Sequence, residues 1–321
     1  MHVYFWGTRG SLPASTTSRM IRAKVFDALK TARSRRLETD EAIDAFIDST
    51  LPFSTRGGYG GNTSCVELRG QDEYVLCDAG TGLRDFGNSL MKSGRLNQPG
   101  SSRVFHLFVS HLHWDHIQGF PFFTPAYIPG NRIIIYGCHA ELERAFVNQQ
   151  EARHFPIPLK AMRAEIEFRT LDPERAYHIA GLTVTGILQN HPGDSYGYCF
   201  VREGKKVVYS TDAEHKQEAE ALDYVFLAFF READLLVFDA QYTLLDAIDA
   251  KADWGHSSNI LGVELAVRAG VKRLCLFHSE HAHDDPTLDR FLETTRGYLK
   301  IYAGDHPLRI DLAYDGLEIE V

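Results

Sequence analysis

The sequence has no apolar run long enough to cross a membrane. A transmembrane helix needs about 20 predominantly apolar residues, and no stretch of the chain offers that many without a charge. The chain opens with a strand-like segment at residues 3–6, without the basic start and apolar stretch of a secretory signal. We therefore expect a soluble protein of the cytoplasm with no membrane partner.

Cysteine is also scarce. The 321 residues include five cysteines, an odd number, and no two of them form a CxxC pair. A disulfide framework and a thiolate zinc site are both disfavoured by this count and spacing. We expect the five thiols to behave as small buried side chains in a reducing compartment.

Positive charge is not in excess. Lys and Arg number 34 against 43 Asp and Glu, which gives a net charge of −9. Long nucleic acid is bound through clustered Lys and Arg, so it is a disfavoured partner. A small anionic ligand stays open, because it needs only a local positive site.

The sequence does have enough apolar material for a large core, with 44% hydrophobic residues. Short β-branched and aromatic runs are separated by Gly, Pro and Asp turns, and amphipathic helices are interleaved in the second half. Strands are predicted at 3–6, 63–69, 73–78, 104–110, 132–136, 166–171, 182–188, 196–202, 206–210, 235–238 and 272–277. Helices are predicted at 81–92, 139–149, 215–229, 257–269 and 286–300. This order fits two sheets faced by outer helices in a single domain over residues 1–321.

One segment, at about 17–50, departs from this pattern. Apolar residues such as Ile21, Val25 and Leu29 recur there at helical spacing, and the pattern breaks near Glu38. Two helices are therefore predicted, a basic one followed by an acidic one. We expect a helical insertion whose charged faces are solvated or paired with each other, with a basic lid over an anionic substrate as the alternative.

The strongest functional pattern is the run SHLHWDH at residues 110–116, directly after the apolar residues 104–109. A loop after a strand can aim three imidazoles and a carboxylate at one point, because it need not follow a side-chain period. Imidazole and carboxylate together suit Zn²⁺, Mn²⁺ or Fe²⁺ better than Ca²⁺ or Mg²⁺. We predict a metal site at His111, His113, Asp115 and His116, with Zn²⁺ as the first choice and Mn²⁺ or Fe²⁺ as alternatives.

Further ligand candidates stand at the ends of other predicted strands. Each of four residues follows an apolar run: Asp78, His191, Asp212 and His278. Loops at strand ends can bring such residues together in one site.

The ordered motifs resemble those of the metallo-β-lactamase superfamily, from Met1 to about His283. They are DAGTG at 78–82, HLHWDH at 111–116, NHP at 190–192, STD at 210–212 and LFH at 276–278. The runs at 6–11, 60–65 and 117–123 are similar to the phosphodiesterase branch, which includes ribonuclease Z and enzymes acting on cyclic nucleotides or cyclic phosphates. The resemblance implies a four-layer αββα sandwich, to which the helical insertion is added, and a hydrolase with two divalent metal ions.

The resemblance also gives each candidate a place in the metal site. The implied sets are His111, His113 and His191 on one ion, Asp115, His116 and His278 on the other, and Asp212 as the bridge. Asp78 would support the ligands by hydrogen bonds without touching metal, and Asp115 would orient the attacking hydroxide. His281, His283 and His215 stay open as contacts to metal or substrate.

Another histidine, His256, stands just before the helix predicted at 257–269. In ribonuclease Z-like relatives a histidine in a comparable place contacts the scissile phosphate and can protonate the leaving oxygen. The resemblance therefore gives His256 a catalytic and a substrate-binding role, and the alternative is a hydrogen bond to a neighbour. Asn62 and Thr63 are predicted as further substrate contacts.

Aromatic residues follow the metal motif, at Phe120, Phe122, Phe123 and Tyr127. Stacking of a nucleobase beside the metals and packing of the loop onto the core both stay open for them.

We predict hydrolysis of a small phosphodiester, a cyclic nucleotide or cyclic phosphate. Ribonuclease Z proteins usually carry a long tRNA-binding arm between the positions of His191 and Asp212, which lie only 21 residues apart here (212 − 191). A tRNA 3′-processing endonuclease and a carboxyl-ester, lactone or thioester hydrolase remain alternatives. A non-catalytic metal-binding protein is disfavoured, because it would be expected to have lost ligands. A homodimer stays open.

Overall fold

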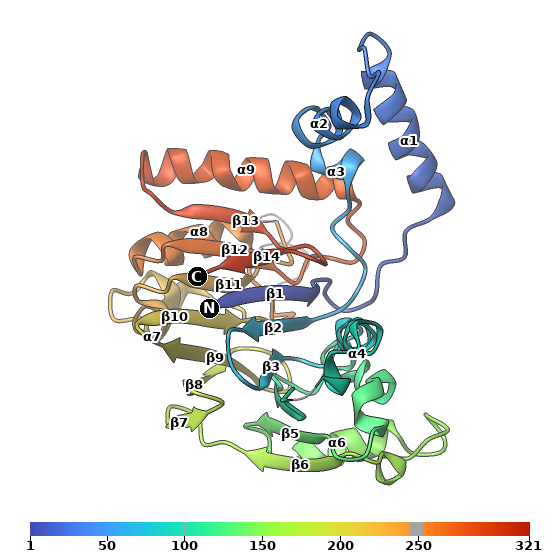
Figure 1. Cartoon of the computed structure of the whole chain (residues 1–321). Coiled ribbons are helices and arrows are strands. Elements are labelled where there is room, and N and C mark those ends of the chain that lie inside the picture. Colours follow the sequence, from blue (N-terminus) through green and yellow to red (C-terminus); the bar gives the residue numbers. More distant parts are fainter. Residues whose placement is uncertain (99, 244–252) are drawn as a thin grey trace.

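The computed structural model describes residues 1–98, 100–243 and 253–321. These residues form two seven-stranded sheets, with the strand orders β14-β1-β2-β3-β4-β5-β6 and β13-β12-β11-β10-β9-β8-β7. The two chain ends lie next to each other in Figure 1, where β1 pairs antiparallel with β14.

The strands of the first sheet are β1 (His2–Gly7), β2 (Cys65–Arg69), β3 (Tyr74–Cys77), β4 (Val104–Phe108), β5 (Arg132–Gly137), β6 (Glu165–Thr170) and β14 (Glu318–Glu320). Those of the second are β7 (Ala176–Ile179), β8 (Leu182–Gln189), β9 (Ser195–Arg202), β10 (Lys205–Ser210), β11 (Leu235–Asp239), β12 (Arg273–Phe277) and β13 (Arg309–Leu312). The helices are α1 (Ser18–Ala32), α2 (Asp40–Thr50), α3 (Phe53–Arg56), α4 (Gly82–Ser93), α5 (Trp114–Ile117), α6 (Leu142–Gln149), α7 (Val225–Phe230), α8 (Asn259–Arg268) and α9 (Asp285–Ala303).

Three clusters of buried side chains hold four layers together. The central cluster lies between the sheets and joins Phe5 and Phe108 of one to Tyr198 and Phe277 of the other. A second cluster packs α4 and α6 onto the outer face of the first sheet, and a third packs α8 and α9 onto the second. Burying an apolar face on each sheet and each helix favours this layering. The predicted αββα sandwich is confirmed.

Parallel strands bring several loops to one edge of the sandwich. β3, β4 and β5 are parallel neighbours in the first sheet, and β10, β11 and β12 are parallel neighbours in the second. The carboxyl ends of parallel neighbours meet at the same edge, where the following loops can converge.

The predicted helix at 215–229 is wrong for most of its length. The structure has a short 3-10 turn at Gln217–Glu220 and then only the six-residue α7. Arg268 of α8 donates to the carbonyl oxygens of Ala219, Glu220 and Ala221. Carbonyls turned towards a guanidinium cannot accept the bonds of a continuous helix, so this tertiary contact overrides the local pattern.

The two predicted helices of the 17–50 segment are present as α1 and α2. Thr17 and Thr39 cap them, since each side chain accepts from a backbone N–H three residues later. Figure 1 shows both helices projecting from the sandwich. No residue of α1, which the structure describes in full, is buried. Lys24 anchors α1 by an ion pair with Asp285.

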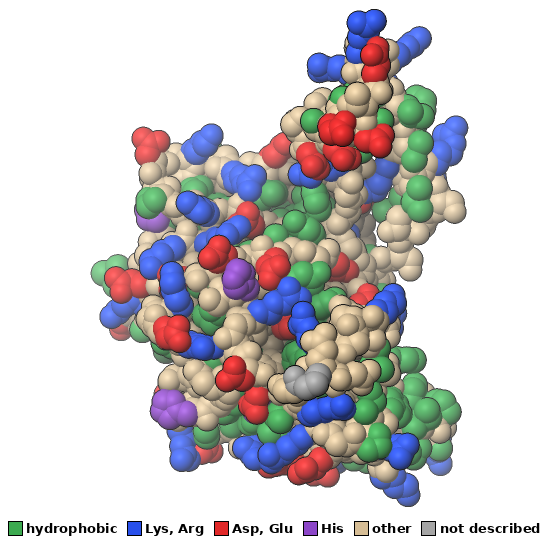
Figure 2. Space-filling view, in the orientation of Figure 1, with side chains coloured by type: hydrophobic (Ala, Val, Ile, Leu, Met, Phe, Trp, Pro, Cys, Tyr) green, Lys and Arg blue, Asp and Glu red, His purple; other side chains and the backbone are tan. Residues whose placement is uncertain are grey.

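The charged faces of this projection are solvated. Among the described residues no ion pair joins α1 to α2, and Figure 2 shows blue and red side chains at the surface of the projection. Apolar residues of α1 are exposed as well, with Phe26 at 58% and Leu29 at 67%.

The five cysteines are free, as expected, and four of them are buried. None of the described helices is both long and apolar enough to cross a bilayer.

Candidate metal centre

The candidate residues meet at the edge formed by the strand ends. His111 and His113 lie in the loop after β4, and Asp115 and His116 lie in the single turn of α5 that continues it. From the second sheet come His191 after β8, Asp212 after β10 and His278 after β12.

Three residues at strand ends have a left-handed backbone. The φ angles are +62° for Asp78, +50° for Asp212 and +61° for His278. Left-handed backbone costs a residue with a Cβ roughly 1–2 kcal/mol. Such strain persists where the surrounding structure enforces it, and it is concentrated at functional sites.

The histidines and carboxylates form two groups of ligand atoms. In the first, the ligand atoms of His111, His113 and His191 all lie within 4.8 Å of one another. In the second, His278 Nε2 lies 3.1 Å from Asp115 Oδ2 and 3.2 Å from His116 Nε2. The structure thus brings together six residues that the sequence separates by up to 167 positions (278 − 111).

Asp212 lies between the two groups, 2% exposed. Its Oδ2 atom faces the first group, 3.6 Å from His111 Nε2 and 3.9 Å from His191 Nε2. Its Oδ1 atom faces the second, 3.3 Å from His116 Nε2 and 3.4 Å from His278 Nε2. A carboxylate in this position can offer one oxygen to each of two ions.

These residues fit divalent metal ions. His111 Nε2 is buried without a hydrogen-bond partner, and buried polar atoms in folded proteins are normally satisfied. Nitrogen faces nitrogen at 3.2 Å between His113 and His191, an arrangement that a shared cation stabilises. Imidazole and carboxylate donors are those of zinc-type sites.

The electrostatics favour positive charge at the centre. Burial raises the pKa of Asp115, but His116 and His278 lower it by more than burial raises it, so the pKa lies below its usual range. Burial and the neighbouring His116 hold the pKa of His111 well below the usual value, so that imidazole is neutral and free to ligate. Burial also lowers the pKa of His116, but Asp115 and Asp212 outweigh burial and raise it. A cation can supply the charge that these carboxylates favour.

Asp78 lies behind the cluster and is fully buried. Its carboxylate accepts from the Ser110 backbone N–H at 2.7 Å and the Ser110 hydroxyl at 2.8 Å, and it lies 2.7 Å from His116 Nδ1. The Tyr209 hydroxyl donates to it as well, at 2.7 Å. These contacts orient the His116 ring so that Nε2 faces the cluster.

His256 lies beside the cluster, its ring centroid 5.1 Å from those of His191 and His278. Its Nδ1 atom is 2.8 Å from Asp239 Oδ2. Burial lowers the pKa of His256, but Asp239 outweighs burial and raises it to about 9. Sequence reasoning missed Asp239, although it directly follows the strand predicted at 235–238, as the other candidates follow theirs.

The side chains of Asn62 and Thr63, the predicted substrate contacts, have hydrogen-bond partners within the chain. Thr63 is fully buried, and its hydroxyl accepts from the Thr81 backbone N–H. The Asn62 amide donates to Asp85 at 2.7 Å and accepts from Arg84. These hydrogen bonds join residues 60–65 to α4, and substrate contact by either side chain stays a prediction.

The three undecided histidines lie outside the cluster. His215 is stacked on Phe238, and its Nδ1 lies 2.6 Å from the Tyr224 hydroxyl. Burial lowers the pKa of His215 to about 4. His281 and His283 line a separate cavity beside α1.

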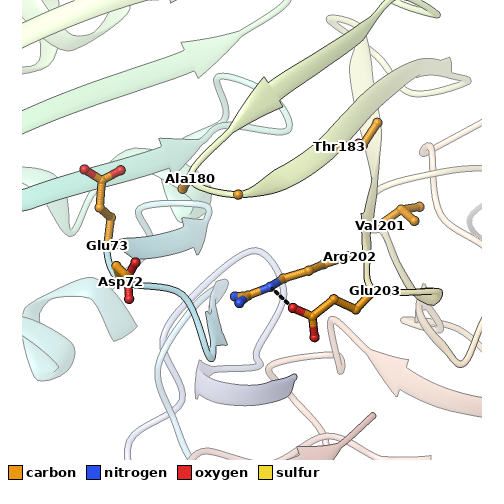
Figure 3. A pocket seen from close by; sticks show the side chains of 8 residues that line it. Asp72, Glu73, Ala180, Thr183, Val201, Arg202 and Glu203 are labelled. Atoms are coloured by element: carbon orange, nitrogen blue, oxygen red, sulfur yellow. Dashed lines mark hydrogen bonds and ion pairs between the residues drawn. The ribbon is translucent and has the colours of Figure 1, made fainter.

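A cavity of about 340 Å³ opens directly onto the cluster. It is lined by Ser11, Leu112, His113, Trp114, Asp115, Asp212, His256 and His278. Another cavity, of about 640 Å³, lies elsewhere, and Figure 3 shows that Asp72, Glu73, Arg202 and Glu203 contribute to its wall. Asp72 and Glu73 precede β3, and Glu203 precedes β10, so this cavity is at the edge opposite the strand ends that hold the cluster.

Comparison with known families agrees with this geometry. Residues 73–279 match the model of the beta-lactamase superfamily domain. The chain belongs to this superfamily. The matched segment includes the histidines of both groups, Asp212 and His256. The predictions of a metal-dependent hydrolase and of divalent metal binding are thereby confirmed at the level of the superfamily.

Curated relatives are named ribonuclease Z. That of Natronomonas pharaonis is 25% identical over 279 residues, which cover 71% of this chain and 85% of the relative. That of Crocosphaera subtropica is 25% identical over 272 residues, which cover 68% of this chain and 80% of the relative. These matches confirm the resemblance to the ribonuclease Z branch.

Solved structures share the fold along the whole chain. The metallo-beta-lactamase fold protein YhfI of Bacillus subtilis has a TM-score of 0.63 and 17% identity, covering 100% of this chain and 98% of its own. A diphosphatase of the PhnP family has a TM-score of 0.61 and 19% identity, covering 100% and 97%. The short form of human tRNase Z has a TM-score of 0.58 and 20% identity, covering 100% and 99%.

Proposed function

We propose that the protein hydrolyses a small phosphodiester, a cyclic nucleotide or cyclic phosphate, with two divalent metal ions. One ion would be held by His111, His113 and His191, the other by Asp115, His116 and His278, and Asp212 would bridge them. The position of Asp212, with one oxygen towards each group, carries this proposal. Zn²⁺ is the expected ion, because imidazole nitrogen dominates the donor set.

Two such ions, when bound, activate water and neutralise charge that develops on phosphate oxygens. The Ser11 backbone N–H orients the Asp115 carboxylate by donating to Oδ2 at 2.8 Å. A side chain at Gly10 would place its Cβ 2.6 Å from His278 Nδ1, so glycine lets this N-terminal loop approach the centre.

His256 supplies the proton for the leaving oxygen. Asp239 holds Nδ1, so the proton to be transferred is on Nε2, and His256 lines the cavity that receives the substrate. A pKa raised by Asp239 keeps the ring protonated at neutral pH, and cations nearby would lower it towards the range in which general acids work well.

Chain geometry supports a small substrate. All of residues 191–212 are described, and most of them form the antiparallel hairpin β9–β10, with Arg202 opposite Lys205 across a tight turn. A long tRNA-binding arm has no place in that segment. The cavity of about 340 Å³ at the cluster is in the range of small-molecule sites.

The second candidate is tRNA 3′ processing, which the names of the curated relatives favour. It requires the RNA to be held by other surfaces of the chain, because the hairpin offers no arm.

The test is a substrate panel on protein loaded with Zn²⁺ or Mn²⁺. Nucleoside 2′,3′- and 3′,5′-cyclic phosphates are compared with precursor tRNA, carboxyl esters, lactones and thioesters. We expect kcat/KM to be highest for a cyclic phosphodiester. Higher values for precursor tRNA would establish the second candidate, and turnover restricted to esters or thioesters would overturn the phosphodiesterase assignment.

A further inference from the structure

A large aromatic side chain is exposed to solvent beside the metal centre. Trp114 lies between the candidate ligands His113 and Asp115 and is 80% exposed. It lines the cavity at the cluster. Tryptophan is on average highly buried, so an exposed indole at this position points to a ligand that covers it.

A second cavity, of about 470 Å³, begins at the same residue. Leu112 and Trp114 line both this cavity and the one at the metal centre, so the two are neighbours. Ile117, Phe122 and Phe155 add an apolar and aromatic wall.

Only one of the three phenylalanines just after the metal motif has an exposed ring. Phe120 and Phe123 are 0% and 1% exposed and belong to the core between α4, α6 and the first sheet. Phe122 is 55% exposed, and its ring meets that of Phe155 edge to face at 5.4 Å. Of these three phenylalanines, Phe122 is the one whose ring is accessible to a ligand.

The chemistry of the wall selects an uncharged planar group. Among the described residues that line this second cavity there is no Lys, Arg, Asp or Glu, and His154 is the one ionisable side chain, so the wall carries no permanent charge for an anionic group. Amides provide the polar contacts, with Asn148 exposed at the rim and the Gln149 Nε2 atom buried without a hydrogen-bond partner. Rings with a few amides form a site for a heterocycle that carries donors and acceptors on its edge.

We propose that the Leu112–Trp114–Phe122–Phe155 cavity is a subsite for the base of a nucleotide whose phosphodiester lies at the metal centre. This inference rests on the proposed function. The base stacks on Trp114 or against Phe122 and Phe155, while its phosphate occupies the adjoining charged cavity. The substrate class is thereby narrowed from small phosphodiesters to nucleotides.

The test compares two cyclic phosphodiesters that differ only in the base. One is a nucleoside 2′,3′-cyclic phosphate, and the other is ribose 2,3-cyclic phosphate, which has no base. Trp114→Leu and Phe155→Leu should each raise KM for the nucleoside substrate by roughly ten- to hundred-fold, the range expected for loss of base stacking. The change in KM for the base-free substrate should be several times smaller, and kcat should change little on either.

Three controls keep the comparison sharp. Trp114→Phe keeps a ring and should recover most of the affinity. Phe26→Leu removes another exposed ring, which lies on α1 and lines neither cavity, and should change nothing. Metal content is measured in each variant, because Trp114 adjoins two candidate ligands. Phe155 lines the second cavity and not the one at the cluster, so its variant decides the matter if the Trp114 variants lose metal.

Calorimetric titration with the free nucleoside separates the subsite from the reaction. Nucleoside binding that Phe155→Leu weakens ten-fold or more supports the subsite even if no phosphodiester is hydrolysed, in which case only the proposed function fails. Hydrolysis with equal KM for the substrates with and without base, or equal losses on both in the variants, would overturn the subsite and leave the function standing.

Discussion

Replacement of His256 by Ala tests the chemistry of the site in most detail. An alkoxide is a poor leaving group at neutral pH, and a positioned general acid contributes about 10²–10⁴-fold by protonating it. His256 is held for this task by Asp239 at 2.8 Å. His256→Ala should therefore lower kcat for a cyclic nucleotide by about 10²–10⁴-fold, with metal content unchanged because His256 is not among the proposed ligands.

The assay compares two leaving groups. A nitrophenyl phosphodiester releases an oxygen that needs no proton, so the loss in His256→Ala should shrink to a few-fold on that substrate. His178→Ala is the matched control, since His178 is exposed on β7, away from the strand ends that hold the cluster. Equal losses on both substrates would refute the general-acid role, and no loss on either would reopen the ester and thioester alternatives.

The contact between His256 and the Asp239 carboxylate predicts a pH dependence of turnover. Burial lowers the pKa of His256 and Asp239 raises it, and a general acid is active below its pKa. Turnover of the cyclic substrate should fall as the pH rises through the pKa of His256. Asp239→Asn removes the charge that raises the pKa, so the alkaline fall in kcat should move to lower pH. An unmoved alkaline limb would show that another group controls it.

Three further predictions concern the metal site and the insertion. Asp212→Ala should remove the carboxylate that faces both groups and with it most activity and metal; unchanged metal content and turnover would refute the bridge. Gly255→Ala should displace His191 and lower metal content, because the new Cβ would lie 2.2 Å from His191 Nδ1. Gly181→Ala, also at positive φ but with nothing within 4 Å, should keep its metal, and equal loss in both would attribute the effect to backbone strain alone. Replacing residues 17–50 by a short linker should leave metal binding intact, since the candidate ligands all lie outside this segment, and should alter substrate affinity or assembly; failure to fold or bind metal would place the segment in the core.

Much of the site was predictable because a local pattern encodes it. His278 directly follows β12, and His191 and Asp212 stand two positions after the ends of β8 and β10. The strand ends of a layered sheet converge on one edge. The same rule applies to Asp239, the last residue of β11, but no motif drew attention to it. Its role depends on the distance to His256, which is 17 residues away in the sequence and is set by tertiary packing.

The parts of the fold that the sequence did not predict are those with a weak local signal. β7 and β13 have only four residues each and β14 has three, too few to establish an alternating pattern. They are stabilised as edge strands by pairing with β8, β12 and β1. The helix predicted at 215–229 fails for the complementary reason, because Arg268 takes the carbonyl oxygens that the helix would need.

Metal titration of the apoprotein tests the central claim most directly. Zn²⁺ or Mn²⁺ is added in steps to metal-free protein, and hydrolysis of a nucleoside cyclic phosphate is followed against equivalents bound per chain. Because Asp212 offers one oxygen to each of the two ligand groups, we predict that activity rises until two equivalents are bound and then levels off. Full activity at one equivalent, or hydrolysis without bound metal, would contradict a two-metal phosphodiesterase.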